Sequence, residues 1–197
     1  MKKITNDITI VGAGLTGLMT AYALSDLKVD IAVIDRFDFF SIKNNNTDLR
    51  TTAIAEGSKC FLDNIKIWDE IKFFSEPIKD IKVVDRKQKT RIDFNNPDAN
   101  QNLGYIVKNN IIKKILLQSL LKKKNIKLIA NNNLEAIHYN ESTLISNFNK
   151  TQIASKLLIA ADGKNSMVRN ILKTPLYKKN YKQKALVVNF NHLKGHN

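Results

Sequence analysis

The fold of this chain is decided by the stretch Asp7-Ile8-Thr9-Ile10-Val11-Gly12-Ala13-Gly14-Leu15-Thr16-Gly17. Its β-branched first part predicts a buried strand over residues 7–11. Apolar side chains at helical spacing predict a helix over residues 15–27, and a second apolar run predicts a strand over residues 29–34. A strand, a helix and a strand in this order form a βαβ unit, so we expect parallel strands with a right-handed crossover.

The glycines of this stretch have the spacing of a dinucleotide-binding loop. Gly12 permits a tight turn, Gly14 lets a diphosphate approach the backbone, and Gly17 lets the helix pack closely on the strand. The first turn of the helix then offers free N–H groups to the phosphates. A glycine turn that only connects strand and helix is the alternative. The strand before the loop, the helix after it and the acidic residue at position 35 argue against that alternative.

Asp35 ends the second strand and would accept hydrogen bonds from the adenosine ribose hydroxyls. An acidic residue there suits an unphosphorylated ribose, as in NAD or FAD, better than NADP. The predicted dinucleotide site therefore consists of Gly12, Ala13, Gly14, Leu15, Thr16, Gly17, Asp35 and Arg36.

A second motif, Asp162-Gly163, follows a buried strand that we predict over residues 157–161. Asp162 can accept hydroxyl hydrogen bonds at the carboxyl end of that strand, where parallel sheets bind their ligands. Ser166 can cap a helix that contains Arg169. Alone, the Asp-Gly pair would indicate an ordinary turn, but together with the glycine loop it favours a cofactor role.

The rest of the chain predicts short helices and strands, and the fold class is therefore α/β, with a Rossmann-like βαβ domain and a small antiparallel meander. Asn110 could cap the second long helix. We expect loops over 37–48 and 95–102, helices over 56–74 and 110–124, a hairpin of 81–84 with 90–94, a strand over 126–130, the meander within 134–153 and a last strand over 185–190.

Composition limits the classes of protein that this chain can be. Its 197 residues suit one domain, or one domain and a fragment of another, and a hydrophobic fraction of 43% excludes wholesale disorder. The single cysteine, Cys60, excludes a disulfide framework and a multi-cysteine zinc site. No apolar run is long enough for a membrane-spanning helix, and the N-terminus lacks the cleavage site of a secretory signal.

The net charge of +14 raises the question of an anionic partner. Only 5 of the 32 basic residues are arginine, which nucleic-acid readers use for bidentate contacts, and few aromatic residues lie among the lysines. We therefore expect no nucleic-acid partner. The lysines could instead help the protein to dock on an anionic membrane.

Four segments resemble the aromatic-ring flavin monooxygenases of the para-hydroxybenzoate hydroxylase type, and more closely the ubiquinone-biosynthesis hydroxylases among them. Lys108 departs from the pattern, because that subgroup usually has glutamate there. The segments are the glycine loop with Asp35-Arg36, Asp48-Leu49-Arg50-Thr51-Thr52-Ala53-Ile54-Ala55, Leu103-Gly104-Tyr105-Ile106-Val107-Lys108-Asn109, and residues 161–169 with the Asp-Gly pair.

The resemblance implies a flavoprotein in which the glycine loop, Asp35 and Arg36 hold the ADP half of FAD. Arg50 would lie near the diphosphate and ribityl chain, and Asn109 near the inner face of the flavin. Asp162, with Gly163 beside it, would contribute to FAD binding and to the transient approach of reduced nicotinamide. In that family NAD(P)H reduces the flavin, O2 adds to form a C4a-hydroperoxide, and the distal oxygen is transferred to an electron-rich ring. Since this chemistry belongs to the cofactor, we expect no catalytic side chain and no metal ligand.

The resemblance also implies that the chain is truncated relative to the family. Residues 1–183 would form the FAD-binding domain, with the 81–94 hairpin on the substrate side. Residues 184–197 would be the first strand of an incomplete substrate domain. A later Gly-Asp segment that completes the flavin site in the family is missing here, so we expect weak FAD affinity and no hydroxylase activity from this chain alone.

The expected function is that of the FAD-binding portion of a monooxygenase that hydroxylates a lipid-tailed, polyprenyl phenol in ubiquinone biosynthesis. The expected location is cytoplasmic, with peripheral contact with the inner membrane or with other ubiquinone-synthesis enzymes. Two alternatives stay open. One is a related flavoprotein of the geranylgeranyl reductase or halogenase type, and the other is a non-catalytic FAD- or NAD-binding remnant.

Overall fold

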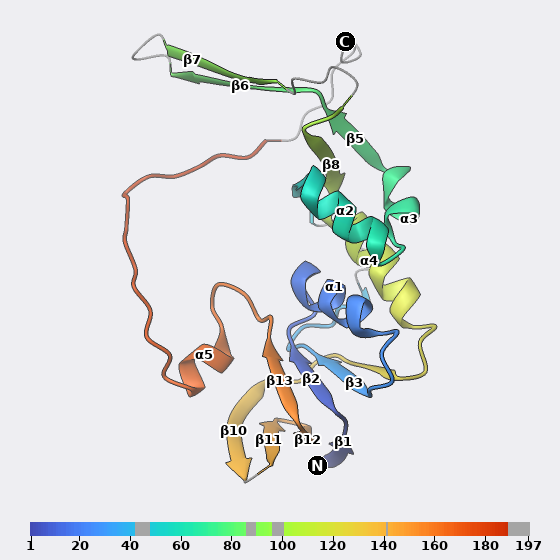
Figure 1. The fold of residues 1–197 in the computed structure, drawn as a ribbon. Coiled ribbons are helices and arrows are strands. Elements are labelled where there is room, and N and C mark those ends of the chain that lie inside the picture. The colour runs from blue at the N-terminus through green and yellow to red at the C-terminus, as the bar shows by residue number, and fades with distance from the viewer. Residues whose placement is uncertain (42–47, 86–89, 96–100, 141, 189–197) are drawn as a thin grey trace.

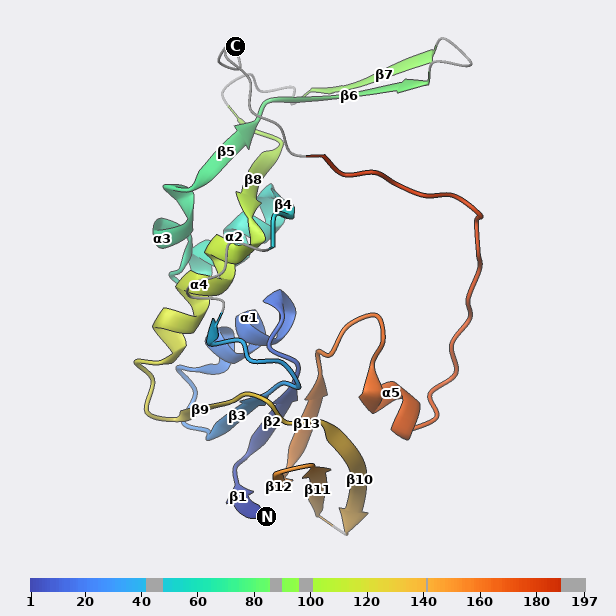
Figure 2. The same ribbon diagram turned by 180° about the vertical axis from the view of Figure 1, so that it is seen from behind.

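The structure, a computed structural model, describes residues 1–41, 48–85, 90–95, 101–140 and 142–188 (Figure 1). A parallel sheet and a second sheet occupy the lower half of Figure 1, and a smaller sheet with helices beside it lies above them. Figure 2 shows the same arrangement from behind, with a hairpin projecting at the top. The predicted α/β class is confirmed.

The parallel sheet has the order β13-β2-β3-β9. Its strands are β13 (Leu157–Ala160), β2 (Ile8–Val11), β3 (Ile31–Ile34) and β9 (Ile126–Ile129). Helix α1 (Leu15–Leu24) connects β2 to β3, which confirms the βαβ unit. Every residue of β3 is buried, as is typical of a parallel strand that is covered on both faces.

The two faces of the parallel sheet border different hydrophobic cores. Ile31 and Val33 pack in the core with α1 and α4 (Asn109–Leu120). Ala32 and Ile34, which point to the other face, pack in a second core with the fully buried Phe148. The alternation of side chains along β3 therefore joins the helical layer to the second sheet.

The second sheet contains the predicted meander and one strand that the sequence did not indicate. β10 (Leu134–Asn140), β11 (Thr143–Phe148) and β12 (Thr151–Ser155) are antiparallel, which confirms the meander. β1 (Lys2–Thr5) adds to β12 in parallel. Residue 141, which lies within the predicted meander between β10 and β11, is outside the described residues.

The smaller sheet, which lies above the other two in Figure 1, was not predicted from the sequence. β4 (Thr51–Ala55), β8 (Gly104–Lys108) and β5 (Ser75–Ile78) form an antiparallel sheet with β8 in the centre. A side chain at Gly104 would overlap the carbonyl of Ile54, so the close pairing of β4 with β8 depends on this glycine.

Two predictions about the helices are wrong. The predicted helix over residues 56–74 is broken into α2 (Glu56–Asn64) and α3 (Trp68–Lys72), because Lys66 has a φ of 59° and the chain turns there to bury Ile67. Asn110 does not cap α4, whose cap position is Lys108.

The predicted hairpin is confirmed as β6 (Asp80–Asp85) paired with β7 (Thr90–Asn95). The register places Ile81 opposite Phe94 and Val83 opposite Ile92, so these four apolar side chains share one face. All four are exposed. The predicted loops over 37–48 and 95–102, and the turn between β6 and β7, lie partly outside the described residues.

The last predicted strand is wrong over its described part. Residues 185–188 have no regular secondary structure, and Leu186 is 88% exposed. Their apolar, β-branched sequence favours a strand, but no described strand pairs with them, and an unpaired strand leaves its backbone groups to water. Residues 189 and 190 of this prediction lie outside the described residues.

Candidate dinucleotide-binding site

A cleft of about 250 Å³ lies at the carboxyl ends of β2, β3 and β13, the edge at which open parallel sheets bind ligands. It brings together the glycine loop, the end of β3 and the Asp-Gly pair. Its lining residues include Gly12, Gly14, Asp35, Arg36, Phe37, Asn132, Asn133, Asp162, Gly163 and Asn165.

Gly12 and Gly17 are required by packing. Gly12 has a φ of 110°, and a Cβ built there would lie 2.6 Å from the carbonyl carbon of Ala161. A Cβ at Gly17 would overlap the carbonyl oxygen of Gly12. These two glycines therefore allow the loop that connects β2 to α1 to pack closely against the residues that follow β13.

Gly14 is different, because a Cβ built there would meet no protein atom within 4 Å. Its φ of −73° is accessible to any residue, so neither packing nor backbone conformation explains the glycine. Gly14 also occupies the cap position of α1, where no side chain caps the helix and no acidic residue lies in the first turn. Open space beside uncapped N–H groups fits a diphosphate, which is the group that FAD would place there.

Asp35 fixes the shape of the cleft at the end of β3. One carboxylate oxygen accepts a hydrogen bond from the backbone N–H of Ala13 at 2.6 Å, and the other accepts one from Phe37 N–H at 2.9 Å. The carboxylate thus ties the glycine loop to the segment after β3. The Arg36 guanidinium lies 4.7 Å from the centre of the Phe37 ring.

Asp162 and Ser166 both cap α5 (Met167–Ile171). Asp162 Oδ2 accepts hydrogen bonds from the N–H groups of Met167 at 2.6 Å and Val168 at 3.2 Å. Ser166 Oγ accepts one from Arg169 N–H at 3.0 Å, which confirms the predicted cap. The Arg169 side chain donates to the carbonyl of Lys164, so the loop after Gly163 is held on both sides.

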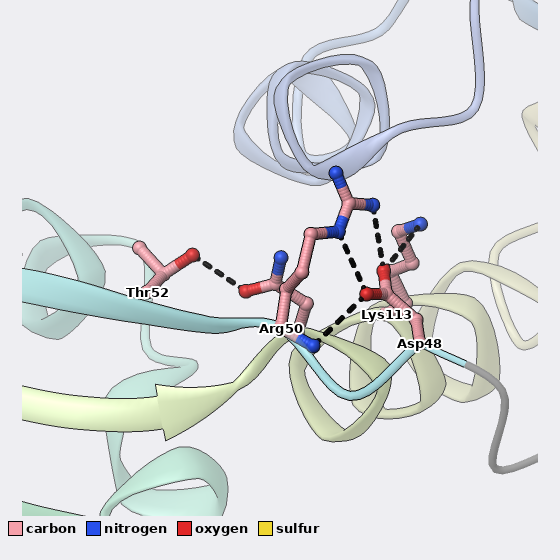
Figure 3. Close-up of polar contacts among 5 residues, drawn as sticks. Asp48, Arg50, Thr52 and Lys113 are labelled. Atoms are coloured by element: carbon pink, nitrogen blue, oxygen red, sulfur yellow. Dashed lines mark hydrogen bonds and ion pairs between the residues drawn. The ribbon is translucent and has the colours of Figure 1, made fainter. Parts of the chain in front are cut away.

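Other residues of the predicted site lie elsewhere. Leu15 and Thr16 line a neighbouring, larger cavity of about 760 Å³, which is mostly apolar and is also bordered by Thr52. Neither Arg50 nor Asn109 lines the cleft. Asn109 is buried and its Oδ1 accepts a hydrogen bond from Thr52 Oγ1 at 2.6 Å, as Figure 3 shows.

The sequence prediction missed the asparagines that line the cleft. Asp35 and Asp162 were predicted because polar residues that follow parallel strands lie at the ligand-binding edge of the sheet. Asn132 and Asn133 follow β9, so the same rule would have found them. The amide of Asn132 is held by Ala130 O and by the Thr151 hydroxyl.

Arg50 forms an ion pair with Asp48, which it holds through Nε at 2.8 Å and Nη2 at 2.9 Å (Figure 3). This hydrogen bonding lowers the pKa of Asp48 from 3.8 to about 2. Because the pKa is depressed in the folded state, the ionised carboxylate stabilises the fold above about pH 4. That stabilisation is lost as the pH falls towards 2.

We expect Asp48→Asn to lower the melting temperature at pH 7 and to have little effect near pH 2, where the wild-type carboxyl also becomes protonated. Thermal melts by circular dichroism at a series of pH values would measure the difference. Asp93→Asn is the matched control, because the exposed pair of Asp93 with Arg91 contributes little at either pH. A deficit of Asp48→Asn that is equal at pH 7 and pH 2 would contradict the assignment.

Within the described ranges there is no group of three His, Cys, Asp or Glu side chains that could hold a metal ion. In the same ranges, no helix has the length and apolar character needed to cross a membrane.

The parallel sheet, the glycine loop at the start of α1 and the acidic residue at the end of β3 define a dinucleotide-binding α/β protein. The family model described as FAD binding domain matches residues 5–196, and the chain therefore belongs to this family.

Known proteins agree with this assignment. The chain is 30% identical to the ubiquinone hydroxylase UbiL of Rhodospirillum rubrum over 96% of its length and 44% of that protein. It is 29% identical to the ubiquinone biosynthesis monooxygenase COQ6 of Dictyostelium discoideum over 92% of its length and 42% of that protein. The chain thus spans less than half the length of these relatives. The resemblance to ring-hydroxylating flavin monooxygenases is confirmed.

A solved structure supports the fold. The flavin-dependent monooxygenase PieE, in complex with FAD and substrate, superposes with a TM-score of 0.72 at 16% identity, over 88% of this chain and 33% of PieE.

Proposed function

We propose that this chain is the FAD-binding portion of a monooxygenase that hydroxylates the ring of a lipid-tailed phenol in ubiquinone biosynthesis. The observation that carries the proposal is the open space at Gly14 beside the uncapped start of α1, in a cleft shared by Asp35 and Asp162. The ubiquinone hydroxylase and monooxygenase named above supply the substrate class.

In this proposal each part of the cleft has a task. Backbone N–H groups at Gly14 and the first turn of α1 bind the diphosphate. Asp35 binds the adenosine ribose, and Asp162 stands at the opposite wall with its Oδ2 fixed by α5. Bound FAD supplies oxygen-transfer chemistry once NAD(P)H has reduced it.

The domain organisation is part of the same proposal. Residues 1–183 form the FAD-binding domain, and the 81–94 hairpin together with residues 184–197 belongs to the substrate side. The exposed apolar face of the hairpin and the exposed Leu186 support this division. Peripheral contact with the cytoplasmic face of an anionic inner membrane would bring the enzyme to a lipid-tailed substrate.

Titration of the purified chain with FAD, followed by flavin fluorescence, tests cofactor binding. We expect weak but saturable binding, and we expect Asp35→Ala to reduce the affinity about tenfold or more, because it removes charge-assisted hydrogen bonds. Asp38→Ala, a substitution of a nearby exposed carboxylate outside the cleft lining, should leave the affinity unchanged. Equal affinity of Asp35→Ala and wild type would exclude the proposed ribose site.

Co-expression of the chain with the carboxyl-terminal half of the Rhodospirillum rubrum relative tests the reaction. After incubation with a polyprenyl phenol, NAD(P)H and O2, mass spectrometry should show the gain of one oxygen atom. Gain of hydrogen in the tail would indicate a reductase, and gain of a halogen a halogenase. Binding of FAD without any product would favour the non-catalytic alternative.

A further inference from the structure

A cluster of three charged side chains lies at the start of β4, outside the cleft. Asp48 accepts two hydrogen bonds from the Arg50 guanidinium and one from the Arg50 backbone N–H at 3.2 Å. Lys113, from α4, places its Nζ 3.7 Å from Asp48 Oδ2. One carboxylate thus faces two cations, which leaves the cluster with one net positive charge (Figure 3).

Burial divides the cluster into a fixed part and an open part. The side chains of Asp48 and Lys113 are 20% and 16% exposed, whereas that of Arg50 is 73% exposed. Nε and one N–H of Nη2 are used by Asp48. The outer N–H groups of Arg50 donate no hydrogen bond to any described residue. The net positive charge is therefore presented at the outer edge of the guanidinium.

The backbone of Arg50 is also fixed by a hydrogen bond. Its carbonyl accepts a hydrogen bond from Asn109 N–H at 2.9 Å, and Asn109 is joined to Thr52. In Figure 3 the guanidinium extends towards α1. Thr52 borders the same cavity as Leu15 and Thr16 in the first turn of α1, so β4 and the cofactor-binding end of α1 are neighbours.

We propose that Asp48 and Lys113 are positioning residues for cofactor binding: they hold Arg50 so that its outer N–H groups meet an anionic group of the dinucleotide. The inference rests on the proposed function. Arg50 makes the contact, since a guanidinium presents N–H groups in a planar fork that suits phosphate oxygens. Asp48 orients that fork, and Lys113 ties the Asp48 carboxylate to α4.

Positioning by Asp48 and long-range electrostatics predict opposite effects of Asp48→Asn on FAD affinity. Asp48→Asn removes a negative charge close to the site, so long-range electrostatics alone would strengthen the binding of anionic FAD. Positioning predicts the reverse. We expect Asp48→Asn to weaken FAD binding about tenfold and Arg50→Met to weaken it about 30-fold, as a charge-assisted contact is disordered or lost.

A double-mutant cycle measured by FAD fluorescence titration tests this. In the Arg50→Met background, Asp48→Asn should cause no further loss, because there is no guanidinium left to orient. If Asp48→Asn lowers thermal stability too far to be titrated, Lys113→Met serves in the same cycle, with an expected loss of about threefold. Asp69→Asn, which removes the partner of Lys72 on α3, is the matched control and should leave FAD affinity unchanged.

Two results would overturn the inference while leaving the proposed function intact. One is FAD binding by Asp48→Asn that is as tight as that of the wild type or tighter. The other is a loss of FAD affinity on Asp48→Asn that is equal in the wild-type and Arg50→Met backgrounds. No FAD binding by the wild-type chain would overturn the proposed function and this inference together.

Discussion

Gly17→Ala is expected to destabilise the protein by about 3 kcal/mol or more, the upper part of the range for overpacking a well-packed site. The new Cβ would overlap the carbonyl oxygen of Gly12 and would lie 3.3 Å from Ala161 Cβ. Backbone atoms cannot move aside as a flexible side chain can, so α1 would have to shift from the sheet. Chemical denaturation followed by circular dichroism would measure the loss.

Gly57→Ala is the control for that experiment. Gly57 lies in α2, and a Cβ built there would meet no atom within 4 Å. Alanine at such a position restricts the unfolded chain, so we expect stability to be unchanged or to rise by about 0.4–1 kcal/mol. A Gly17→Ala protein as stable as wild type would show that α1 does not approach the glycine loop this closely.

Gly14→Val, unlike Gly17→Ala, should leave the stability of the protein normal and should reduce its affinity for FAD about 100-fold. The backbone at Gly14 accepts any residue, and the valine side chain would enter open space. That space is where the diphosphate would lie, so hydrogen bonds to the phosphates, each worth about 1.5–3 kcal/mol, would be lost. The measurement is FAD titration together with a thermal melt.

Gly14→Ala supplies the graded comparison, with a smaller loss of affinity and the same melting temperature. If Gly14→Val bound FAD as tightly as wild type, the diphosphate could not lie against the start of α1. A large loss of stability in either variant would instead show that the site is packed against protein.

The elements that have a clear local sequence pattern were predicted correctly. The glycine loop, the strands beside it and the meander followed from spacing and alternation. β4, β5 and β8 were missed, because each is short and is stabilised by partners distant in the sequence. The break between α2 and α3 was missed because Lys66 adopts a positive φ that lysine does not favour.

The sequence predicted the part of the candidate site whose motifs follow parallel strands, because that position places the residues at one edge of the sheet. Gly12, Gly14, Asp35 and Asp162 meet in one cleft, as the rule for carboxyl ends of parallel strands requires. Asp48 and Lys113 could not be paired from sequence, since they are far apart in the chain and meet only when α4 packs beside β4.

The pairing of the strands also determines when the cofactor loop can form during synthesis. β1 pairs with β12 and β2 pairs with β13, so residues 2–11 are joined to residues 151–160, which are synthesised much later. Contacts over such a separation form slowly. The turn at Gly12 packs against Ala161, which leaves the ribosome almost 150 residues later. The nascent chain therefore has its dinucleotide-binding sequence early but acquires the binding shape only after β13 has emerged.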